Sequence, residues 1–231
     1  MKPDNTYYVG YKLRIIILEQ RALELRYNHN HDDRGRFTFS SGGGSAPKKV
    51  DKSGKSDKIK YEDSSSKRIR ITQKAIDSVP DVSAFSSDEL NKLVTDKCRE
   101  ILTDLKSDAV GTEETVSIKL SSLESEKRKG GQGDGVVEGI VFDEPYITIH
   151  NHPSCKTFSG RDIDLFAYDS QLKAICIVGN DGRVFILHKT TEFNWTKYGI
   201  ETFFIQGKKD YAESILKEAD KYGFKYYQKA N

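Results

Sequence analysis

The chain has 231 residues, with 37 Lys+Arg, 35 Asp+Glu and a formal net charge of +2. This near balance excludes a strongly basic nucleic-acid binder, and an equally acidic protein, as a property of the whole chain. Hydrophobic residues make up only 36% of the chain, which predicts a segment outside the packed core. No apolar run approaches the ~20 residues of a membrane helix, so we expect no membrane partner.

The three cysteines are odd in number and widely spaced: Cys98, Cys155 and Cys176. Such a set does not form a disulfide framework, and it favours a reducing compartment. We therefore expect a cytoplasmic protein.

The N-terminal part of the chain is basic and of low complexity. Residues 1–70 carry 16 Lys+Arg against 9 Asp+Glu. Residues 1–27 contain a predicted short helix, and residues 28–67 are rich first in Ser and Gly and then in Lys, Ser and Asp. A stretch of this composition cannot bury enough apolar surface to fold alone, so it predicts a flexible linker. We expect nucleic-acid contact only through this basic arm, for which the alternative is a solvated tether.

Residues 68–231 have the pattern of one folded domain. Ser86 and Ser87 before two acids predict a helix start, and Gly179–Gly182 is typical of a hairpin turn. The charged, Gly-rich residues 125–135 predict an exposed loop. The expected helices are 86–106, 159–170 and 208–222, and the expected strands are 114–120, 136–142, 146–150, 173–178 and 184–188. These elements predict an α+β fold, with a mixed, mostly antiparallel sheet and flanking helices.

Two histidines and an acid form the most informative pattern. His150 and His152 have strand spacing, so both imidazoles point to the same face. Two neighbouring neutral imidazoles are well suited to share a Zn²⁺ ion. In the Ser159-x-x-Asp162 pattern at a predicted helix start, Asp162 can supply a third ligand. Three protein ligands leave a position open for water, as in catalytic zinc sites.

The string from His150-x-His152-Pro153 to Ser159-x-x-Asp162 resembles the metal motif of the JAB/JAMM (MPN) metalloprotease-like family. The loop between His152 and Ser159 is one residue shorter here than is usual in that family. The resemblance implies zinc bound by His150, His152 and Asp162, and hydrolysis of a peptide or isopeptide bond in a protein substrate. It also implies that Ser159 stabilises the oxyanion and that an upstream Glu is the general acid/base.

The resemblance leaves three candidates for this Glu: Glu114, Glu113 and Glu138. We prefer Glu114, because strand alternation puts it on the same face as Val116 and Ile118. The interval between Glu114 and His150 lacks the helix that most JAB domains place there.

Residues 69–189 also resemble phage and prophage proteins encoded near head-morphogenesis genes. The segment His31–Thr38 of the arm is similar to segments of phage head and portal-region proteins. This resemblance implies phage head proteins as partners, and a location in the host cytoplasm or the virion.

Several alternatives stay open. His150 and His152 could be hydrogen-bonded residues of a strand face, and Ser159 and Asp162 could be only a capping pair. Cys155 could be a ligand or nucleophile, although an incidental position is the simpler interpretation. The competing functions are a metal-independent nuclease or toxin-like domain, and a non-catalytic head-assembly protein that keeps the fold.

Overall fold

The computed structural model describes residues 68–133, 137, 139–203, 205–206 and 208–229. The predicted segments 1–27 and 28–67 lie outside these residues. No helix in the described part of the chain is long and apolar enough to cross a membrane.

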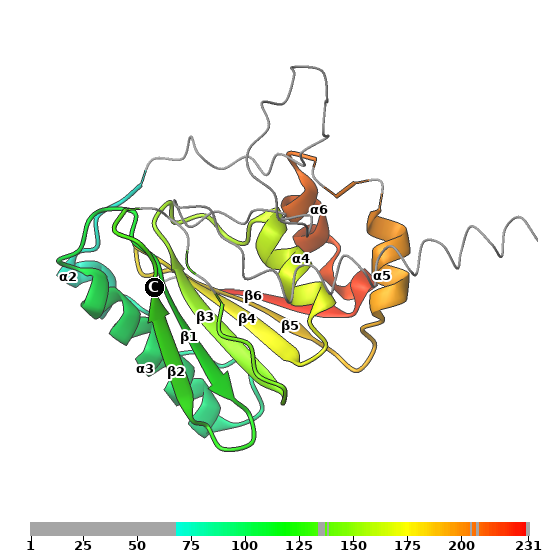
Figure 1. Ribbon diagram of the computed structural model, residues 1–231, viewed down its shortest axis with the longest axis horizontal. Coiled ribbons are helices and arrows are strands. Elements are labelled where there is room, and N and C mark those ends of the chain that lie inside the picture. The colour runs from blue at the N-terminus through cyan, green and yellow to red at the C-terminus, as the bar shows by residue number, and fades with distance from the viewer. Residues whose placement is uncertain (1–67, 134–136, 138, 204, 207, 230–231) are drawn as a thin grey trace, which may run out of the picture.

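Helices and strands follow one another in short runs along the chain (Figure 1). The helices are α2 (Gln73–Asp77), α3 (Asp88–Leu105), α4 (Gly160–Tyr168), α5 (Trp195–Thr202), α6 (Tyr211–Lys217) and the 3₁₀ helix η1 (Ala219–Tyr222). The strands are β1 (Glu114–Lys119), β2 (Ser125–Lys129), β3 (Tyr146–His152), β4 (Leu172–Gly179), β5 (Val184–Lys189) and β6 (Phe224–Lys229).

The strands form one open six-stranded sheet in the order β2-β1-β3-β4-β5-β6. Strands β3 and β4 are parallel, with α4 between them in the chain, and every other neighbouring pair is antiparallel. The fold is therefore α+β with a mixed, mostly antiparallel sheet, which confirms the predicted fold class.

Helix α3 covers one face of the sheet, and α4, α5 and α6 cover the other (Figure 1). Ser87 caps α3 by accepting a hydrogen bond from the Leu90 amide, as the sequence predicted. The buried stripe of α3 packs on alternate strand residues such as Val116 and Ile149. Because strand side chains alternate between faces, the residues between them point to the α4 side.

The α4 side has its own apolar core. Ile163 and Phe166 of α4 pack against strand residues such as Ile175 and Ile177. Towards β1 and β2 this face becomes polar, and buried hydroxyl groups replace the aliphatic side chains. The alternate residues of β3 that point to the α4 side are Tyr146, Thr148, His150 and His152. The two histidines therefore face α4. The site thus lies at the carboxyl end of β3, beside the start of α4.

Three secondary-structure predictions were wrong. Residues 125–129 form strand β2 and not a loop. Its Lys127 binds Asp104 of α3 and its Lys129 binds Asp108 just after α3, which explains a strand with so little apolar character. Residues 137 and 139–142, the described part of the predicted strand 136–142, form no strand. The predicted helix 208–222 is divided between α6 and η1, and β6 follows it unpredicted.

Candidate metal site

The histidine pair lies side by side on β3. Each residue is 9% exposed, and the two Nε2 atoms are 3.1 Å apart. The parallel pairing with β4 extends to His152, so the strand is held by main-chain bonds up to the site. The prediction that both imidazoles share one face is confirmed.

Asp162 reaches the same point from the first turn of α4. Its Oδ1 lies 3.5 Å from His150 Nε2, and its Oδ2 lies 3.4 Å from His152 Nε2. The Ser159 amide donates to Asp162 Oδ2 over 2.7 Å, and the Asp162 amide donates to Ser159 Oγ over 3.2 Å. This reciprocal capping box fixes the carboxylate against the histidines, so capping and metal binding are compatible.

His150, His152 and Asp162 could hold a metal ion, because one ligand atom from each lies within 4.8 Å of the others. Ligands of a tetrahedral zinc at 2.0–2.1 Å are about 3.3 Å apart. The two Nε2 atoms are 3.1 Å apart, close to this value, and they lie 3.5 and 3.4 Å from different oxygens of Asp162. His152 Nδ1 lies 3.1 Å from the carbonyl oxygens of both Lys156 and Thr157. A proton on Nδ1 would leave Nε2 as a metal ligand.

Without metal the site is an ion pair. Burial lowers the pKa of His152, but its contact with Asp162 and the charge of Glu113 outweigh burial and raise it to about 9. Burial opposes ionisation of Asp162, yet the two histidines hold its pKa well below the usual range. A metal cation at this point would replace the proton on His152 as the partner of Asp162.

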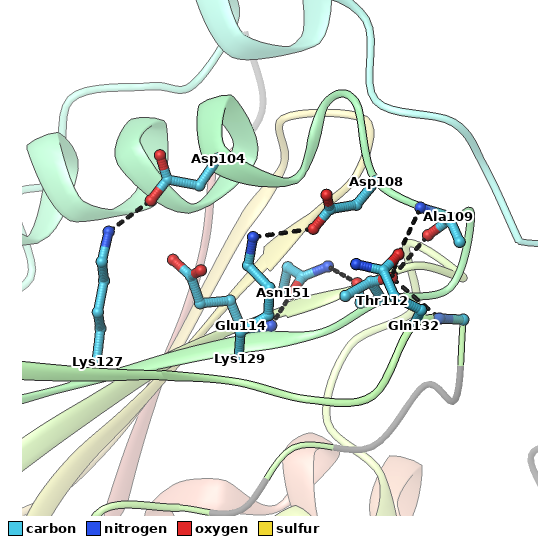
Figure 2. A network of polar contacts seen from close by, with 10 residues as sticks. Asp104, Asp108, Ala109, Thr112, Glu114, Lys127, Lys129, Gln132 and Asn151 are labelled. Carbon is cyan, nitrogen blue, oxygen red and sulfur yellow. Dashed lines mark hydrogen bonds and ion pairs between the residues drawn. The ribbon is translucent and has the colours of Figure 1, made fainter.

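The preferred general base, Glu114, lies on the wrong face of the sheet. It does share the face of Val116 and Ile118, as predicted, but that face packs under α3. Figure 2 shows its carboxylate pointing toward α3, between Lys127 and Lys129 and away from the histidine face. Strand alternation thus separates Glu114 from His150, His152 and Asp162, which together form the metal group.

Glu113 is the acid on the histidine side. The antiparallel ladder of β1 and β3 ends at the pair Thr115 and His150, and the same register continued by two residues brings Glu113 to His152. The Glu113 pKa is raised to about 8, chiefly by burial; the charge of His152 opposes this shift, and that of Asp162 adds to it. Glu113, Thr115 and Ser117 are alternate residues, so they point to the same, polar face of the sheet. This polar alternation was the signal that could have identified Glu113.

The other candidates take no part in the described metal group. Cys155 is buried in the loop after His152, with φ of 56°, and its thiol is free. Burial raises its pKa to about 11, which makes the thiolate a poor ligand or nucleophile candidate at neutral pH. Glu138 lies outside the described residues.

No family model, curated protein or solved structure matches the chain.

Proposed function

We propose that the domain is a zinc-dependent hydrolase of the JAB/JAMM type, acting on a peptide or isopeptide bond. The observation that carries this proposal is the convergence of His150, His152 and Asp162 on one point, with Glu113 near enough for its charge to interact with those of His152 and Asp162. Metal ligands and a separate titratable acid are the two components that a metal-assisted hydrolase needs.

The donor set supports zinc. Two imidazole nitrogens and one carboxylate oxygen are common zinc ligands, and three protein ligands are typical of catalytic zinc sites. The resemblance of the motif to the JAB/JAMM family points to the same ion. Because two His and one carboxylate also bind Fe(II) in oxygenases, elemental analysis is the decisive measurement of metal identity.

Bound zinc would lower the pKa of a water molecule to about 7 and polarise the substrate carbonyl. A bound cation would lower the pKa of Glu113 from its metal-free value of about 8, so its carboxylate would accept the proton of that water and return it to the leaving amine. Ser159 Oγ accepts one hydrogen bond in the α4 cap, so its O–H can still donate to an oxyanion. Glu113 thus replaces Glu114 in the role of general base.

The proposed substrate is a protein or peptide. The resemblance of residues 69–189 and of the arm to phage proteins supports phage head proteins as partners, with action in the host cytoplasm or on the virion.

The test combines metal content with hydrolysis. Purified full-length protein should bind one zinc per chain and cleave peptide or isopeptide substrates. His152→Ala should lose zinc and activity together. Glu113→Gln should keep zinc but lower kcat by about two to four orders of magnitude. Glu114→Gln is the matched control, since it makes the same change one residue along on the opposite face.

Three outcomes would contradict the proposal. Activity without metal would favour the nuclease or toxin-like alternative. Stoichiometric zinc without hydrolysis of any substrate would favour a head-assembly protein that only keeps the fold. Equal losses of kcat in the Glu113 and Glu114 variants would refute the assignment of the base.

A further inference from the structure

The side chain of Asn151 links β1 to β3 beside the metal group. Asn151 lies between the two histidines in sequence, but its side chain points to the opposite face and is fully buried. Its Oδ1 accepts a 2.8 Å hydrogen bond from the Glu114 amide. Its Nδ2 donates to the Thr112 carbonyl at 3.2 Å and to Asn180 Oδ1 at 3.0 Å. Figure 2 shows Asn151 in this position between Thr112 and Glu114.

The two main-chain groups bound by Asn151 flank Glu113. The regular ladder between β1 and β3 ends at the pair Thr115 and His150. Beyond that pair, the side-chain amide of Asn151 connects β3 by hydrogen bonds to the main chain on either side of Glu113. The Glu113 carbonyl is itself held by the Gly130 amide at 2.8 Å.

A second amide holds Asn151 in place. Asn180, in the turn between β4 and β5, receives the Asn151 bond and donates to the Ile69 carbonyl at 2.8 Å. The Ile69 amide donates to the Pro153 carbonyl, one residue beyond His152, also at 2.8 Å. The chain of bonds therefore begins and ends at the metal-binding strand. Buried amides whose hydrogen bonds are all satisfied are rigid, and such supports fix the geometry of catalytic groups.

We infer that Asn151 is a positioning residue, which holds Glu113 in register with His152 so that the acid can serve the metal site. This inference rests on the proposed function. It assigns Asn151 no contact with substrate or metal, because its side chain lies on the far face of β3. Its effect on hydrolysis must therefore pass through Glu113.

The test uses Asn151→Ala, with Asn91→Ala as a matched control. Asn91 is also buried, and its side-chain amide also binds the main chain: it accepts from the Phe85 amide and donates to the Phe85 carbonyl. It lies at the start of α3. Hydrogen exchange of the zinc-free protein measures directly the clamp that the Asn151 side chain forms with the Thr112 carbonyl and the Glu114 amide. The Glu114 amide should exchange at least about tenfold faster in Asn151→Ala, while the Val116 amide of the same strand stays protected. Asn91→Ala should leave both unchanged.

Kinetics separate positioning from general damage. Asn151→Ala should keep one zinc per chain and lower kcat by about 10- to 100-fold with KM little changed. In a Glu113→Gln background the same substitution should have no further effect. If Asn151→Ala does not fold, Asn180→Ala should give a smaller loss of the same kind. This variant removes the bond that orients Asn151 together with the Asn180 bond to the Ile69 carbonyl, and it leaves the Asn151 bonds to Thr112 and Glu114 in place.

An equal loss of kcat in both backgrounds, or loss of zinc, would overturn the inference, since Asn151 would then support the histidines or the fold at large. An unchanged exchange rate at Glu114 would overturn it whether or not the protein is a hydrolase. A wild-type protein without zinc or activity would instead refute the proposed function, and the exchange measurement would still decide whether the clamp exists.

Discussion

Zinc binding should become tighter with rising pH, because His152 must lose a proton before it can bind the ion. The pKa of His152 is raised to about 9, so at pH 7 roughly 99% of the metal-free sites carry this proton. The apparent zinc affinity at pH 7 should then be about 100-fold below its limit at high pH. Between pH 7 and 8 it should rise about tenfold, which corresponds to about 1.4 kcal/mol.

Calorimetric titration in buffers of different ionisation enthalpy would count the protons released. We expect about one proton per zinc from His152 at pH 7. Competition with a chelator between pH 6 and 9 would give the affinity. The variant Glu113→Gln is the control for a second titration, since the pKa of Glu113 is raised to about 8 and its charge acts on the same site.

A zinc affinity that stays constant between pH 7 and 8, with no proton release, would refute this reasoning. His152 would then be neutral in the metal-free protein, and the ion pair with Asp162 would not exist in solution. Proton release that disappears in Glu113→Gln would assign the titration to Glu113.

Three further predictions concern the Ser159 cap, the basic arm and the pH dependence of stability. Ser159→Ala should lower the free energy of unfolding by about 0.5–2 kcal/mol, measured by denaturant titration, and should weaken zinc binding because Asp162 loses its cap partner. A chain that lacks residues 1–67 should still fold and bind zinc, as measured by circular dichroism and metal content. The Tm of the zinc-free protein should fall from pH 7 to 9, because the folded pKa values of His152 (about 9) and Glu113 (about 8) lie above their unfolded values of 6.5 and 4.5. A constant Tm over this range would contradict those shifts.

The metal group was predictable because its signals are local. The spacing of His150 and His152 sets a shared face in any strand, and a Ser-x-x-Asp pattern sets a helix cap wherever a helix begins. Bringing Asp162 to the histidines needs only the short connection from the end of β3 to α4. None of these steps depends on how distant strands pair.

The choice of Glu113 over Glu114 as the acid on the histidine side was not predictable in the same way. Alternation correctly grouped Glu114 with Val116 and Ile118, but it does not say which face of the sheet carries the histidines. That choice depends on the pairing of β1 with β3 and on which helix covers which face. The polar phase of the two strands, with Thr115 opposite His150, would have favoured Glu113.

The missed elements have a related cause. Strand β2 is exposed along its whole length, so it has no apolar alternation to read. It is held by pairing with β1 and by ion pairs from Lys127 to α3 and from Lys129 to Asp108 just after α3, all of which are tertiary features. Strand β6 similarly depends on its pairing with β5.

Glu114, which lies outside the metal site, should destabilise the fold when it is ionised. Its side chain is 2% exposed, and its Oε1 has no hydrogen-bond partner. Burial raises its pKa, and the acids Asp104 and Glu100 add to the effect, although Lys127 and Lys129 oppose it. A folded pKa above the unfolded 4.5 means that stability is lost as the pH rises through the folded value.

Glu114→Gln should therefore raise the free energy of unfolding of the zinc-free protein at pH 8, by about 1–2 kcal/mol. The gain should shrink toward pH 4, where the wild-type carboxyl is protonated in both states. Denaturant titrations at the two pH values measure the difference. A lower stability of the variant at pH 8 would show that attraction to Lys127 and Lys129 outweighs burial. An equal gain at both pH values would show that packing, and not ionisation, sets the effect.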